Sequence, residues 1–215
     1  MDTRTSAADG RGARTPSVRT RKKVVDAARR IMRDGEFRSL TMEGVAREAS
    51  VSKATVYRWW SNRASVAMEV LLEVAGPGTP YLEPEAGPLD NLRLHIRIAA
   101  DFLGGPDRSL LTGIVADMQH DPELAEAFRR DYLEHRRSLV KGLMRDAIEV
   151  GDLGAEVDPD VLTDRLIGPL YYRLLLGHAQ VDRAFADEIF DLTVAPAGSG
   201  WDQRTDGASG KRRAR

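Results

Sequence analysis

The sequence predicts an all-α protein, and three observations carry that prediction. Apolar residues recur with the 3.6-residue period of a helix in nearly every segment of residues 19–195. No stretch alternates apolar and polar residues over the length of a strand, and β-branched residues do not gather into runs. Helix-starting and helix-ending residues flank most of the periodic segments. Residues 1–18 and 196–215 lack any such period and are rich in small polar residues, so we expect two disordered arms, the first of them basic.

The first two helices are predicted from their boundaries and their apolar faces. Residues 19–33 place Val24, Val25 and other apolar side chains on one face, and Asp34-Gly35 follows as a stop signal. Thr41 is the expected N-cap of a short second helix. Leu40 and Val45 have the spacing of a hydrophobic staple across that cap.

A third and a fourth helix follow at once. Ser52 is the expected N-cap of a short helix over residues 53–59, and Asn62 that of a helix ending near Ala75. Two capped helices joined by a turn of three to four residues form a helix-turn-helix pattern, in which the second helix presents side chains to the major groove of DNA. The side chains expected to be exposed there include no acidic group: Ser52, Lys53, Ala54, Thr55, Arg58 and Trp59. Val56 and Trp60 are expected to point inward.

The charge distribution agrees with a polyanionic partner. Residues 1–65 carry 15 basic and 7 acidic residues, whereas the remainder carries 17 basic and 26 acidic ones. A basic front on an acidic body indicates that one end meets a polyanion. Nucleic acid is the first candidate, and an anionic membrane surface is the second.

The run TMEGVAREASVSKATVYRWWSNRASVAMEVL resembles the DNA-binding segment of TetR-family (tetracycline-repressor-like) transcriptional regulators. The resemblance covers roughly residues 20–70 and includes the T-x-x-x-V-A and V-S-x-x-T-x-Y patterns. It implies that Thr41 and Tyr57 contact phosphates and that Arg63 clamps a phosphate at the start of the fourth helix. It also implies that Lys53 and Thr55 face bases or the adjacent backbone, and that Trp59 lies against the backbone or a thymine methyl group. The expected DNA contacts are therefore Thr41, Ser52, Lys53, Ala54, Thr55, Tyr57, Arg58, Trp59 and Arg63.

Three positions depart from the family pattern. Ser50 stands where the turn commonly has glycine, and serine tolerates a left-handed backbone poorly, so we expect a slightly different turn. Ala64 replaces a common acidic residue after the basic one. Trp59 is bulky enough to change base preference. None of these departures changes the assignment.

The second half is predicted to be helical after a loop. Residues 76–88 contain four prolines and cannot form a helix. Helices are expected to start at Asp90, near Leu110, at Asp121-Pro122, at Asp158-Pro159 and after Asp182, and the third of these is expected to run to about Val150. The helix after Asp158 leaves almost no polar face and must be covered on two sides, which favours a dimer contact. The expected interface residues are Leu166, Leu170, Leu174 and Ile189.

These features predict an N-terminal three-helix helix-turn-helix DNA-binding domain (19–66) and a C-terminal helical ligand-binding and dimerisation domain (67–195). The resemblance implies a homodimeric repressor that binds a near-palindromic double-stranded DNA operator and is released by an unknown small-molecule effector. A ligand-independent or partner-controlled DNA-binding protein and a transcriptional activator stay open as alternatives. The candidate pocket residues are Ile96, Met118, Phe128, Tyr132 and Tyr171.

Several classes of function are disfavoured by what the sequence lacks. It contains no cysteine, no glycine-rich phosphate loop, no nucleophile elbow and no HExxH motif, so we expect no enzyme, no cofactor and no metal site. The four histidines show no metal-ligand spacing; His95 or His178 either lines a pocket or is an ordinary core or surface residue. No apolar run reaches the ~18–20 residues of a membrane span, so we expect a cytoplasmic protein without membrane contact.

Overall fold

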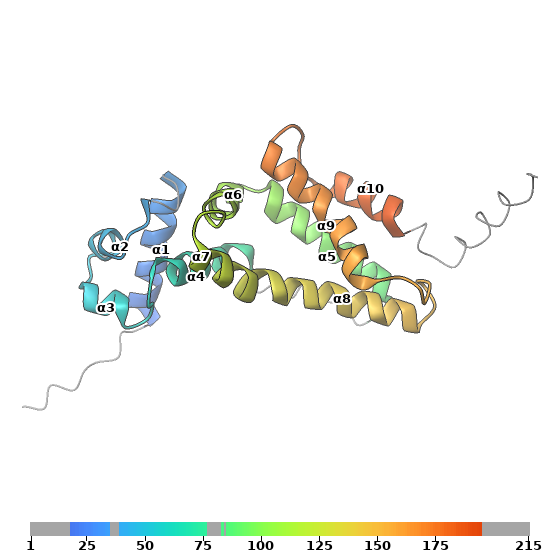
Figure 1. Ribbon diagram of the computed structural model, residues 1–215, viewed down its shortest axis with the longest axis horizontal. Coiled ribbons are helices and arrows are strands. Elements are labelled where there is room, and N and C mark those ends of the chain that lie inside the picture. Colours follow the sequence, from blue (N-terminus) through green and yellow to red (C-terminus); the bar gives the residue numbers. More distant parts are fainter. Residues whose placement is uncertain (1–17, 35–38, 77–82, 84, 195–215) are drawn as a thin grey trace, which may run out of the picture.

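The computed structural model describes residues 18–34, 39–76, 83 and 85–194, and over these residues its regular structure is entirely helical (Figure 1). The predicted all-α fold is confirmed. The predicted arms, 1–18 and 196–215, lie outside the described residues except for Val18, which opens the first helix.

The N-terminal unit consists, in its described residues, of α1 (Val18–Asp34), α2 (Met42–Glu48) and α3 (Lys53–Tyr57), together with the start of α4 (Arg63–Ala75). The three predicted N-caps, Thr41, Ser52 and Asn62, all form. Each side-chain oxygen accepts a hydrogen bond from the backbone N–H three residues later, at 3.0, 3.1 and 2.8 Å. These caps satisfy amides that a short helix otherwise leaves unpaired.

The turn between α2 and α3 contains Ser50 in the left-handed region, with φ 55°. Its N–H donates to the carbonyl of Arg47 at 3.1 Å, and the N–H of Val51 donates to the carbonyl of Ala46 at 2.9 Å. These two bonds form a Schellman motif, in which glycine is the usual left-handed residue. The expected change in the turn is therefore absent, because Ser50 adopts the conformation that glycine takes elsewhere.

The body of the protein follows after the loop: α5 (Pro88–Gly104), α6 (Arg108–Asp117), α7 (Pro122–Ala127), the π-helical turn η2 (Phe128–Leu133), α8 (Glu134–Glu149), α9 (Pro159–Leu176) and α10 (Arg183–Val194). Helix α5 starts two residues before the predicted position, because Pro88 occupies its first turn. The helix predicted from 122 to about 150 is a continuous run, but η2 widens it near its start.

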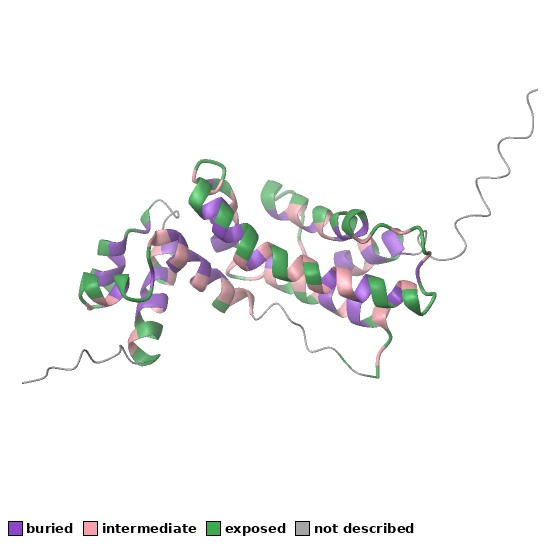
Figure 2. Cartoon of the chain, turned by 60° about the horizontal axis from the view of Figure 1, so that its bottom comes forward, coloured by how far each residue is buried: buried purple, intermediate pink, exposed green. Residues whose placement is uncertain are grey.

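Helix α4 joins the two units through a shared core. It packs on α1 of the N-terminal unit and on α6, α7 and η2 of the body. Val66, Val70 and Leu71 are fully buried along it, and they belong to a hydrophobic cluster with members on both sides of this junction. Figure 2 shows buried residues in both units. A displacement of α4 would therefore disturb the packing on both sides of the junction.

Three of the four predicted dimer-interface residues are placed elsewhere by the fold. Leu166 and Leu170 of α9 have no exposed surface and Leu174 has 8%, because this stripe packs into the chain's own core. In this conformation Leu166 and Leu170 offer no surface to a partner and Leu174 offers little, so the single chain does not support the predicted contact through these three residues. Ile189 is half-buried against the core.

Candidate nucleic-acid interface and cavity

Helix α3, which the sequence predicts to face the major groove as the recognition helix, lies at the end of the protein opposite α10 (Figure 1). Its predicted contact residues Ser52, Lys53, Ala54, Tyr57, Arg58 and Trp59 are exposed, and Thr55 is half-buried. Val56 and Trp60 are buried beneath them, as predicted. Thr41 at the start of α2 is exposed as well, so its hydroxyl proton remains available to a phosphate oxygen.

One ion pair crosses from α3 to α2. Lys53 Nζ lies 3.0 Å from a carboxylate oxygen of Glu43. The hydrogen bond from Lys53 lowers the pKa of the Glu43 carboxyl below its usual value. Both side chains are more than half exposed, so the pair contributes little to stability and instead holds the ammonium group beside the recognition surface.

The two tryptophans at the end of α3 are held by residues of α1 and α4. Trp60 Nε1 donates to a carboxylate oxygen of Glu69 at 2.7 Å. The Arg21 guanidinium pairs with Glu69 at 2.8 Å and lies 5.0 Å from the centre of the Trp59 ring. This cluster fixes the orientation of Trp59 on the exposed face. Sequence reasoning did not predict the contacts of Arg21 with Glu69 and Trp59, because these residues lie far apart along the chain and leave no local signal.

Arg63 differs from the other predicted DNA contacts. Its guanidinium is half-buried and bonds to the Asp121 carboxylate at 2.8 Å, while the neighbouring Asn62 amide donates to Glu123. Asp121 also caps α7, accepting a hydrogen bond from the N–H of Leu124 at 3.0 Å. That backbone bond and the Arg63 side chain lower the pKa of the Asp121 carboxyl. A phosphate would therefore have to compete with Asp121 for Arg63.

A second ion pair joins the two units near the other end of α1. Arg29 Nη2 lies 2.5 Å from the carboxylate of Asp107, which directly precedes α6. Arg33 of α1 approaches the same carboxylate at 3.8 Å. The N-terminal unit is thus attached to the body at α6 as well as at α7.

The body contains a cavity of about 200 Å³ between α5, the η2–α8 run and α9. Its lining includes Ala75 and Gly76 at the end of α4, together with His95, Tyr132, Arg136 and Tyr171. Of the predicted pocket residues, Tyr132 and Tyr171 line it, and so does His95, one of the two histidines considered for a pocket. His178 is exposed beyond the end of α9.

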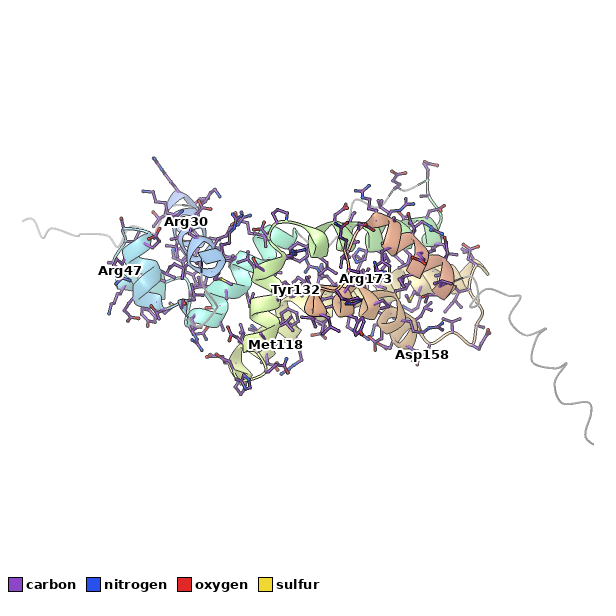
Figure 3. The ribbon with its side chains drawn as sticks, turned by 90° about the horizontal axis from the view of Figure 1, so that it is seen from above. Arg30, Arg47, Met118, Tyr132, Asp158 and Arg173 are labelled. Atoms are coloured by element: carbon purple, nitrogen blue, oxygen red, sulfur yellow. The ribbon has the colours of Figure 1, made fainter. Side chains whose placement is uncertain are left out.

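The other three predicted pocket residues do not line this cavity. Ile96 has no exposed surface, because its side chain packs into the core. Phe128 is also in the core and stacks on Tyr132, with ring centres 5.0 Å apart. Met118 is the C-cap residue of α6 and is not among the residues that line the cavity. Figure 3 labels it together with Tyr132, which does line the cavity. This cavity does not support the prediction for these three residues, because apolar periodicity does not distinguish a packed side chain from one that faces a void.

The polar groups of the cavity are neutral at neutral pH except for the arginines. Burial and the nearby charge of Arg136 lower the pKa of His95 to about 4, so its imidazole is uncharged. Burial raises the pKa of the Tyr171 phenol well above 10, and the neighbouring Tyr132 raises it further. Both phenols therefore remain hydrogen-bond donors.

Comparison with known proteins identifies the family. Residues 24–70 match the model of bacterial regulatory proteins of the tetR family, and residues 84–193 match that of the tetracyclin repressor-like C-terminal domain. The chain belongs to the TetR family. It is 32% identical over 171 residues to the uncharacterized HTH-type transcriptional regulator YdeS of Bacillus subtilis, covering 79% of this chain and 85% of that protein. It is 28% identical to the DNA-binding transcriptional repressor TetR of Mycobacteroides abscessus, covering 75% and 84% of the two chains.

Solved structures of TetR-family regulators share the fold. The crystal structure of the regulator SCO0332 superposes with a TM-score of 0.66 at 29% identity, covering 82% of this chain and 97% of that one. FadR of Bacillus subtilis, solved in complex with stearoyl-CoA, gives the same TM-score at 17% identity and covers 81% and 98%, which shows likeness of fold alone. As a TetR-family member the chain is a DNA-binding transcriptional regulator and not an enzyme. None of the helices that the structure describes could cross a bilayer.

Proposed function

We propose that the protein is a homodimeric repressor that binds a near-palindromic DNA operator and is released by a small-molecule effector. The observation that carries this proposal is the course of α4. Its first residue, Arg63, lies beside the recognition unit, and its end at Ala75 and Gly76 lines the cavity. One helix therefore touches both proposed binding sites, so that occupation of one site can bias the other.

The proposed DNA surface consists of the exposed side chains at α3 and the start of α2. Lys53 and Thr55 read bases or the adjacent backbone, while Thr41 and Tyr57 bind phosphates. Ser52, Ala54, Arg58 and Trp59 complete the surface. Arg63 joins it only if it leaves Asp121. We assign this surface to a DNA-binding domain of residues 19–66, and regulation and dimerisation to residues 67–195, with α4 running across the boundary.

The proposed dimer contact is the outward stripe of α9 together with α10. Large apolar side chains on these helices are about half to two-thirds exposed in the single chain: Val161, Tyr172, Leu175, Leu176 and Leu192. Their spacing places the α9 members along one face, opposite Leu166 and Leu170. A second copy related by a two-fold axis would cover this face, with Ile189 at its margin. Two recognition helices would then meet half-sites roughly 34–36 Å apart or a multiple of a helical turn.

DNA binding is tested by fluorescence anisotropy with a duplex from the region beside the protein's own gene, at several salt concentrations. We expect salt-sensitive, sequence-selective binding that the double variant Tyr57→Phe, Thr55→Ala weakens. Arg145→Gln, on the exposed face of α8, is the control and should bind as the wild type does. Equal binding to scrambled DNA, or no binding at low salt, would contradict the proposal.

The dimer and the direction of regulation need separate readouts. Light scattering should give the mass of two chains for the wild type, and Leu176→Glu should shift it toward one chain. A reporter gene behind the bound DNA should fall in output when the protein is present. A rise in output would instead establish an activator.

A further inference from the structure

Arg136 faces the cavity as a cation whose contacts, among the described residues, include no carboxylate. Its Nη2 donates to the carbonyl oxygens of Ala75 at 3.3 Å and Gly76 at 3.1 Å, and its Nη1 to that of Tyr132 at 3.4 Å. The guanidinium carbon lies 4.0 Å from the centre of the Tyr132 ring. The next residue, Arg137, differs sharply, because it bonds to two aspartates of α9.

The carbonyls that Arg136 holds are those at the end of α4. The helix ends at Ala75, and Gly76 follows with φ 72°. Unpaired carbonyls at a helix C-terminus carry partial negative charge, so a guanidinium placed there stabilises the helix end. Arg136 therefore connects the cavity to α4 by direct hydrogen bonds.

The rest of the cavity wall determines the size and polarity of a ligand that could bind there. Most of its wall is apolar, from Ile98, Ala99, Phe102 and Ile167 among others. His95 contributes a buried Nδ1 without a hydrogen-bond partner, on a side chain that is 6% exposed. An apolar cavity of 150 Å³ accepts benzene, so about 200 Å³ accommodates roughly one ring and a small polar group.

We propose that the effector is a compact organic monocarboxylate, with an apolar body of about one ring, whose carboxylate pairs with Arg136. This inference rests on the proposed ligand-responsive function. The planar guanidinium fits a carboxylate through two parallel hydrogen bonds, which are stronger than its present bonds to neutral carbonyls. Binding of the carboxylate would break the hydrogen bonds from Arg136 to the carbonyl oxygens of Ala75 and Gly76, which stabilise the C-terminal end of α4. A cationic ligand would be repelled, and an uncharged one would leave the guanidinium on the carbonyls.

The experiment compares matched ligands on the full chain by thermal shift and calorimetry. Three acid–amide pairs are used, benzoate with benzamide, cinnamate with cinnamamide and hexanoate with hexanamide, and benzylamine is the cationic probe. We expect at least one acid to bind tenfold or more tightly than its amide, and benzylamine not to bind. Arg136→Gln should abolish the preference for the acid, and Arg136→Lys should retain part of it. Arg145→Gln removes an exposed arginine of the same helix and should leave the preference unchanged.

Each acid is compared with its amide within one variant, so a loss of stability in Arg136→Gln does not affect the conclusion. The inference is overturned if no acid binds better than its amide, or if the preference survives in Arg136→Gln. Operator binding is measured on the same preparations, and the preferred acid should weaken it about 5–150-fold. A wild type that binds the acid but no DNA would refute the proposed function while leaving the ligand assignment in place.

Discussion

Acidification should destabilise the protein through His95. Burial and the positive charge of Arg136 lower the pKa of this imidazole from 6.5 to about 4 in the folded state. In the unfolded chain the group takes up a proton below about pH 6.5. A group whose folded pKa is depressed contributes stability above its unfolded pKa and loses it as the pH falls toward the folded value. The stability that depends on neutral His95 is therefore present at pH 7 and lost progressively between about pH 6.5 and 4.

The size of the stability loss follows from the difference between the folded and unfolded pKa values of His95. One pKa unit corresponds to about 1.4 kcal/mol, so acidification from about pH 7.5 to about pH 5 should cost roughly 2 kcal/mol. For a chain of this length the same change lowers the melting temperature by roughly 4–8 °C.

The assay is urea unfolding at the two pH values for the wild type, His95→Gln and His120→Gln. His95→Gln can differ in absolute stability, but it should lose about 2 kcal/mol less than the wild type on acidification. His120 is exposed, so His120→Gln should lose as much as the wild type does. If His95→Gln and the wild type lose equal stability, His95 is not held neutral in the fold and the reasoning is refuted.

Three further substitutions test the local geometry. Gly44→Ala places a Cβ 2.8 Å from the Thr41 hydroxyl that caps α2, and it should lower the stability measured by thermal unfolding by about 1 kcal/mol. Gly142→Ala is the control, because its Cβ meets nothing within 4 Å, and equal effects of the two substitutions would contradict this reasoning. Ser50→Gly should stabilise by about 0.5–1 kcal/mol by relieving the left-handed serine, and a destabilised variant would argue against strain. Asp121→Asn keeps a helix-capping residue but removes the charge that holds Arg63, so DNA binding measured by anisotropy should tighten about fivefold. An unchanged affinity would show that Arg63 does not contact DNA.

The sequence was most informative where the signal is local. Thr41, Ser52 and Asn62 each bond to an amide three residues away, so their capping role is encoded within four residues. The exposed face of α3 follows equally directly, because Val56 and Trp60 define the buried side of one short helix. For these elements, period and capping suffice without knowledge of the rest of the chain.

The orientation of α9, the cavity and the contacts of Arg136 could not be predicted from the sequence, because each depends on residues far apart along the chain. Helix α9 is apolar on two sides, so its periodicity does not reveal whether Leu166 or Tyr172 faces inward, and only packing against α5 and α8 decides this. The cavity was equally hidden, because a void depends on side chains contributed by several helices. The hydrogen bonds of Arg136 to Ala75 and Gly76 join residues that are 61 and 60 positions apart, and no local sequence pattern predicts such a contact.

Under the proposed function, the attachments of α4 are the route by which a small ligand would influence the DNA surface. At its start Arg63 is bound to Asp121, and at its end the carbonyls of Ala75 and Gly76 are bound to Arg136. Its 13 residues form a rod of about 20 Å, packed on both units and able to move only as a whole. A ligand that displaces Arg136 and a phosphate that recruits Arg63 would each break one attachment of the same helix. Because the two binding equilibria are thermodynamically linked, any effect of the ligand on DNA affinity must be matched by an equal effect of DNA on ligand affinity.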